Sequence, residues 1–233
     1  MDAWIEFARG PLFLFAFTFM LLGMVRHFLL TGFEMWRAMR RAGDKSLPKG
    51  QVFINTVKWL FPLSKMGNRF FYSLTSIVFH VAILVVPIFL AGHIALWSRG
   101  IGLAWPAIPN GVADVLTIVA NVTAHALVLQ RLAAKATRKL SRLQDYIMPL
   151  LVALPFVTGL FAMHPSISPF SYKANLLLHV LSGNLIFILM PLTKLSHAVL
   201  MPSVQAVSEI GWHFPPDAGS RLAADLGKEG ESI

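Results

Sequence analysis

Residues 176–200 read LLLHVLSGNLIFILMPLTKLSHAVL, an almost continuous apolar stretch that contains two histidines, His179 and His197. The two residues are five whole helical turns apart, so in a roughly straight helix both imidazoles leave the same face, about 27 Å from each other. That distance is close to the thickness of a bilayer. Because an ionisable ring inside hydrocarbon is costly without a partner, the pair predicts one bound group near each membrane face.

The composition is that of a membrane protein. Hydrophobic residues make up 56% of the chain and charged residues 13%, and the apolar runs are long enough to cross a bilayer repeatedly. The chain has no cysteine, which excludes a covalently attached c-type haem, a thiolate-held iron–sulfur cluster and a disulfide. The net charge is +9, but the basic residues cluster in particular loops, which indicates membrane orientation and argues against a nucleic-acid partner.

The apolar runs predict an all-α integral membrane protein with five transmembrane helices. The expected spans are approximately residues 11–36, 70–97, 110–130, 146–163 and 174–201. The first span follows an acidic N-terminus and lacks the pattern of a secretory signal, so we expect it to be retained. The five spans define a membrane domain over residues 1–201. Residues 202–233 are expected to be a tail that docks a partner or is disordered.

Lysine and arginine gather on one side of these spans. The loop after the first span carries Arg37, Arg40, Arg41, Lys45, Lys49, Lys58, Lys65 and Arg69, and the loop after the third carries Arg131, Lys135, Arg138, Lys139 and Arg142. The segments on the other side carry only Arg9, Arg99 and Lys173. The positive-inside rule therefore predicts an N-terminus outside and a cytoplasmic C-terminus.

The first cytoplasmic loop contains a mixed apolar and polar stretch, KGQVFINTVKWLFPL, at residues 49–63. Such a stretch is typical of a helix that lies in the membrane interface, and equally of a surface that docks a partner subunit. The sequence leaves both open.

The second expected span holds another pair, His80 and His93, in FHVAILVVPIFLAGHIALW. Because the second and fifth spans run in opposite directions, His80 should lie at the depth of His197, and His93 at the depth of His179. Each level then offers two imidazoles, which can fill both axial positions of a haem iron and suit electron transfer. The sequence thus predicts two non-covalent haems, about 20 Å apart along the second span.

One feature of the second span conflicts with a straight helix. The thirteen positions from His80 to His93 turn an ideal helix so that the two rings point roughly 140° apart. Pro87 lies between them and removes a backbone donor. We therefore expect a kink or altered winding near Pro87 that changes the relative direction of the rings.

These residues resemble a known family. The fifth span has a histidine, a proline and then TKLSH at residues 193–197, and the second span has FH at 79–80 and GH at 92–93. This pattern is similar to that of the gamma subunit of respiratory nitrate reductases, a di-haem cytochrome b with five spans. The second-span histidines are farther apart here than in nitrate reductase. The chain looks more like the relatives found in heterodisulphide-reductase-like complexes of sulfur metabolism.

The resemblance implies a subunit of a respiratory oxidoreductase complex in the prokaryotic cytoplasmic (inner) membrane, rather than a stand-alone enzyme. It would carry two haem b groups, the outer one on His93 and His179 and the inner one on His80 and His197. Electrons would pass between menaquinone or ubiquinone, on the outer side, and partner subunits that carry iron–sulfur clusters or several haems. The direction of flow is left open.

Other polar residues have weaker assignments. Arg26 and Lys194 are candidates to pair with haem propionates, and each is equally suited to reaching the membrane interface. His164, at the outer end of the fourth span, is a candidate quinone contact or an ordinary interface residue. Gly92 and Gly183 would let a flat macrocycle approach the backbone, although glycine also serves helix packing.

Two other classes of function fit the same composition. One is a haem-free transporter that uses intramembrane histidines as proton relays. The other is a structural anchor that recruits a soluble enzyme through the basic loop and the tail. Visible haem absorption would separate both from the cytochrome.

Overall fold

The computed structural model describes residues 1–43, 47–60 and 70–230. Within these ranges the chain is helical and contains no strand. Five helical stretches are long and apolar enough to cross a membrane: Asp2–Arg41, Phe70–Phe89, Asn110–Ala133, Leu143–Met163 and Tyr172–Leu189. Many of their large apolar side chains face outward, Leu84, Val115 and Val122 among them, as expected where lipid is the solvent. The protein is therefore an all-α, multi-pass membrane protein.

The helices belong to two compact units, Met1–Leu21 with Ser64–Leu195, and Leu22–Leu63 with Ser196–Ile233. The first unit contains α1 (Asp2–Arg9), the start of α2 (Pro11–Arg41), α4 (Phe70–Phe89), α5 (Ala91–Ile101), α6 (Asn110–Ala133), α7 (Lys135–Leu140), α8 (Leu143–Met163), η2 (Pro165–Ile167) and α9 (Tyr172–Leu189). The second unit contains the rest of α2, α3 (Lys49–Leu60), α10 (His197–Gly211) and α11 (Ala218–Asp225). A short helix, η3 (Lys194–Ser196), lies at the junction.

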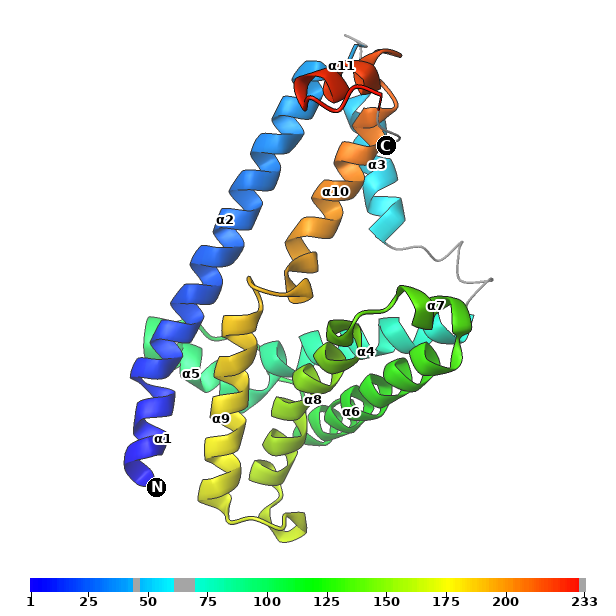
Figure 1. Ribbon diagram of the computed structural model, residues 1–233. Helices are drawn as coiled ribbons and strands as arrows, with labels where there is room; N and C mark the ends of the chain where they lie inside the picture. The colour runs from blue at the N-terminus through cyan, green and yellow to red at the C-terminus, as the bar shows by residue number, and fades with distance from the viewer. Residues whose placement is uncertain (44–46, 61–69, 231–233) are drawn as a thin grey trace. The chain divides into compact units, whose positions relative to one another are not determined.

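The first unit is built around α6 and α8, which pack against each other. Helix α4 packs on α6, α9 packs on α8, and α1 packs on α9 (Figure 1). Ala82, Ala120 and Ala124 are fully buried where α4 meets α6, because small side chains let the helix backbones approach closely. Phe79 and Phe156 fill the remaining space of this core.

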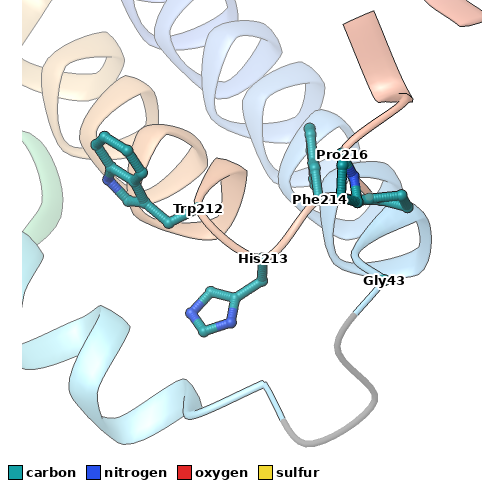
Figure 2. A pocket seen from close by; sticks show the side chains of 6 residues that line it. Gly43, Trp212, His213, Phe214 and Pro216 are labelled. Carbon is teal, nitrogen blue, oxygen red and sulfur yellow. The ribbon is translucent and has the colours of Figure 1, made fainter.

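The second unit is held by the C-terminal half of α10. Ile210 is 1% exposed and packs with Ala38 of α2 and with Ala42, the residue after that helix. A pocket of about 520 Å³ lies beside this contact (Figure 2). Its lining is Gly43, Trp212, His213, Phe214, Pro215 and Pro216. The N–H of Gly43 donates to the His213 carbonyl at 2.7 Å, and a Cβ at residue 43 would meet Pro215 at 3.0 Å, so the chain closes tightly there.

The expected fifth span is wrong in its second half. Helix α9 ends at Leu189, a turn follows, and His197 begins a new helix, α10. Pro191 has no N–H to continue the helix, and the N–H groups of Leu192 and Thr193 both donate to the Leu189 carbonyl, at 3.1 and 3.0 Å. A straight five-turn helix from His179 to His197 therefore does not form.

The expected tail also differs from the structure. The predicted boundary at residue 202 falls inside α10, and α11 follows at Ala218–Asp225. Ser203, Ala206 and Ile210 recur at helical spacing and are buried, a short periodicity that the sequence analysis missed. Residues 231–233 lie outside the described ranges, as do the basic residues Lys45, Lys65 and Arg69 and positions 61–63 of the amphipathic stretch.

Candidate functional site

A break in the second span sets the direction of His93. Helix α4 ends at Phe89, Leu90 is extended with φ −71° and ψ 128°, and α5 begins at Ala91. The kink or altered winding expected near Pro87 is instead a full break three residues later, so the expected single span over residues 70–97 is two helices.

The carbonyl of Val86 keeps an ordinary helical bond at this break, whereas those of Pro87, Ile88 and Phe89 have no helical partner and accept from other donors. The Val86 carbonyl accepts from the Leu90 N–H at 3.0 Å, and the Phe89 carbonyl accepts from the Ile108 N–H at 3.0 Å. The indole of Trp105 donates to the Ile88 carbonyl at 2.9 Å. The remaining carbonyl, that of Pro87, is bonded by Nδ1 of His93 at 3.0 Å. The ligand candidate is thus part of the structure that ends α4.

The break brings His93 of α5 opposite His179 of α9. Their ring centres are 5.9 Å apart and the ring planes differ by only 5°. Nδ1 of His179 bonds the Pro155 carbonyl of α8 at 2.8 Å. Because a carbonyl can only accept, both Nδ1 atoms must be the donors, which leaves Nε2 of each neutral ring with its lone pair. This is the tautomer that binds a metal, held by the outer hydrogen bond typical of histidine ligands.

Gly159 of α8 leaves the space that the His179 ring occupies. A Cβ built at residue 159 would lie 3.0 Å from both Cε1 and Nδ1 of His179. Any larger residue would push the imidazole away from the Pro155 carbonyl that orients it. Gly159, Pro155 and Trp105 have no local sequence signal for these roles, which depend on contacts between segments distant in the chain.

The pair has the dimensions that a bis-imidazole haem needs. An imidazole nitrogen binds a metal at about 2.0–2.1 Å, so two imidazoles on opposite sides of one iron have ring centres about 6 Å apart. His93 and His179 are at 5.9 Å. The distance between the ring centres is therefore that of two imidazoles on one iron, and binding would also require both Nε2 atoms to turn towards the metal, because the lone pair lies in the ring plane.

The two predicted glycines are not helix-packing positions in the part of the chain that the structure describes. At both Gly92 and Gly183 an added Cβ would meet no atom within 4 Å. The alternative role that the sequence left open for them, close helix packing, is wrong within these ranges. Their possible role beside a macrocycle stays a prediction.

The second predicted pair is divided between the two units. His80 lies on α4 in the first unit, and its Nδ1 bonds the Ser76 carbonyl at 2.7 Å, which favours the same ligand tautomer as in the outer pair. His197 is the first residue of α10 in the second unit. The pairing of His80 with His197 stays a prediction.

The other predicted site residues have varied surroundings. Lys194 forms an ion pair with Asp145 in the first turn of α8, and Arg26 is an exposed residue of α2. His164, which follows α8, has its Nε2 3.0 Å from Oδ2 of Asp114 on α6, with both side chains partly exposed. No local sequence pattern links Asp114 to His164, because the two residues are 50 positions apart in the chain.

An aromatic cluster lies next to His93. Trp97, one turn further along α5, packs against Phe17 with ring centres 5.5 Å apart. Phe17 also packs on Phe13 and on Phe187 of α9, each at 5.8 Å. This cluster joins α2, α5 and α9 and so fixes the two helices that carry the outer histidines.

Comparisons with known proteins give one informative match. No family model matches the chain, and no solved structure matches it. A protein of Nitratidesulfovibrio vulgaris (strain Hildenborough) is 36% identical over 170 residues, which cover 71% of this chain and 74% of the relative, and its name is simply "Protein". That name carries no activity, but the identity and coverage are sufficient to show common descent. The chain belongs to the same family as this N. vulgaris protein.

Proposed function

We propose that this protein is a di-haem cytochrome b subunit that transfers electrons between the quinone pool and partner subunits of a respiratory complex in the prokaryotic cytoplasmic membrane. The observation that carries the proposal is the His93–His179 pair, with parallel rings at 5.9 Å and each Nδ1 bonded to a carbonyl. A chain that only anchors a partner has no need for two imidazoles oriented in this way.

His93 and His179 would hold the outer haem, and His80 and His197 the inner one. When bound, each haem accepts and donates one electron at its iron. Two histidines on one iron would leave no position for oxygen, so a haem bound here would supply electron transfer and not oxygen chemistry. The carbonyls of Pro87 and Pro155 would raise the basicity of the ligands through Nδ1.

The His164–Asp114 pair suits the proton chemistry of a quinol. If Nε2–H of His164 donates to Asp114, Nδ1 carries the lone pair and can accept a proton from a quinol hydroxyl, while the carboxylate stabilises the imidazolium that forms. Both residues are in the first unit, and His164 lies five residues beyond Gly159 along the same chain segment. At a rise of 1.5 Å per helical residue, His164 would lie about 7.5 Å further along the chain than Gly159, the residue against which the His179 ring packs.

Quinol-driven reduction of the haems tests this role. We expect a soluble menaquinol or ubiquinol analogue to reduce the haems of the purified protein, which is seen as the absorption spectrum of the reduced form. The His164→Gln and Asp114→Asn variants should lower the rate by about 100-fold, the usual effect of losing a general base, with the haem content unchanged. His213→Gln is the control, because His213 belongs to the second unit. Unchanged rates in both variants would remove His164 and Asp114 from the proposed quinol site.

The partners follow from the predicted orientation. Electrons that reach His80 and His197 would leave on the cytoplasmic side, to a subunit that carries an iron–sulfur cluster or several haems. Release of quinol protons outside combined with inward electron transfer would make the reaction electrogenic. The reverse reaction would reduce quinone and consume the membrane potential.

A further inference from the structure

The side of helix α3 that packs against the rest of the second unit includes polar residues. Val52, Asn55, Thr56 and Trp59 are buried or partly buried, on the side where α3 packs against α10. Asn55 donates to Glu209 of α10 at 3.1 Å, so the packed face includes polar groups. The hydrogen-bonding side of this amphipathic helix is thus already used within the second unit.

The outward face of α3 is apolar. Phe53 is 69% exposed, Ile54 45% and Val57 37%. At about 100° per residue these three side chains cover an arc of roughly 100°, and its centre is opposite the centre of the packed face. A monomeric soluble surface would have polar side chains here.

Two lysines border this apolar arc. On the helical wheel Lys49 lies about 90° to one side of the centre of the arc and Lys58 about 90° to the other. Both are exposed, and α3 contains no acidic residue. An apolar strip with a lysine on each flank is the arrangement of a helix that lies flat in a lipid interface, with its charges at the level of the headgroups.

We propose that α3 lies in the headgroup region of the cytoplasmic leaflet, with Phe53, Ile54 and Val57 inserted among the acyl chains and Lys49 and Lys58 on anionic phospholipid. The charge of the two lysines favours lipid over a protein partner, because the cytoplasmic leaflet is anionic and attracts lysines on this side of the membrane. The exposed face also lacks the dispersed hydrogen-bonding groups of a specific protein interface. The proposal is independent of haem or quinone binding.

The absence of cysteine makes the test direct, since a single introduced cysteine can be labelled without background. The full-length protein is reconstituted in vesicles of phosphatidylglycerol and phosphatidylcholine, with a fluorescent label at Phe53→Cys, Val57→Cys or the control Gln51→Cys. Gln51 is exposed on the same helix but lies more than 90° from the centre of the apolar arc. Quenching by acyl-chain nitroxides is then compared with quenching by iodide from the water phase.

We expect labels at 53 and 57 to be quenched by the lipid nitroxides and protected from iodide, and the label at 51 to show the reverse. Replacing Lys49 and Lys58 with glutamine, or omitting phosphatidylglycerol, should shift the labels at 53 and 57 towards iodide. Strong iodide quenching at 53 and 57 in the anionic vesicles would overturn the proposal. Protection from both quenchers would also overturn it, because a protein surface would then cover α3.

Discussion

The His179→Ala variant is expected to retain about one of the two haems and to lose reduction by quinol. The His179 ring bonds the Pro155 carbonyl through Nδ1, and its centre lies 5.9 Å from that of His93. Without this ring the proposed outer haem would have one histidine ligand, which would weaken its binding and change the spin state of any haem that stays. Because the outer haem would receive electrons from quinol, quinol reduction should be lost together with it.

The same result is expected for His93→Ala, since the two rings act as one site. His125→Ala is the matched control: His125 is also an intramembrane histidine whose Nδ1 bonds a helix carbonyl, that of Asn121 at 2.8 Å, but it is outside both predicted pairs. The measurement is the amount of haem per purified chain, together with folding checked by gel filtration. Two full haems in either the His93 or the His179 variant would refute the outer pair.

Gly159→Val is expected to lower the haem content in the same way, without touching a ligand. Even the first carbon of the new side chain would lie 3.0 Å from Cε1 and Nδ1 of His179, and the two further methyl groups of valine increase the overlap. The ring must then leave its bond to Pro155. With Gly159→Ala a shift of a few tenths of an ångström is enough, so both haems should remain while the outer haem changes in reduction potential and absorption.

The control for the two Gly159 variants is Gly111→Val on α6, where an added Cβ meets no atom within 4 Å among the described residues. Redox titration of the purified variants, followed by haem absorption, gives both the number of haems and their potentials. If Gly159→Val has the wild-type haem content and potentials, then the position of the His179 ring does not depend on Gly159.

The number of spans and their approximate positions were predictable, because a long apolar run in a membrane folds as a transmembrane helix. The sequence predicted the pairing of His93 with His179 from depth alone, and the structure brings these two rings together. A kink or altered winding near Pro87 was expected, and the helix instead continues through Pro87 and breaks three residues later, at Leu90. The residue at which the helix breaks, Leu90, was not predictable, because the break depends on caps from Trp105 and Ile108 in a later loop.

Other features were wrong or missed for the same reason. The expected straight helix from His179 to His197 is interrupted near Pro191. A proline is a helix-ending signal, but the apolar run continues on both sides of it and favoured a single span. Glycine roles were assigned to the neighbours of the histidines in sequence, Gly92 and Gly183, whereas the glycine that touches a histidine ring is Gly159 of another helix. Asp114 was missed because it is 50 residues from His164 in the chain. Contacts between helices carry this information, and a single sequence does not.

The central claim, that paired imidazoles hold two haems at two depths, is tested most directly by a reduced-minus-oxidised absorption spectrum of the purified protein, with the haem quantified chemically. The account predicts a b-type spectrum and about two non-covalent haems per chain. A flat spectrum from intact, folded protein would contradict it, and would favour a transporter or an anchor that contains no haem.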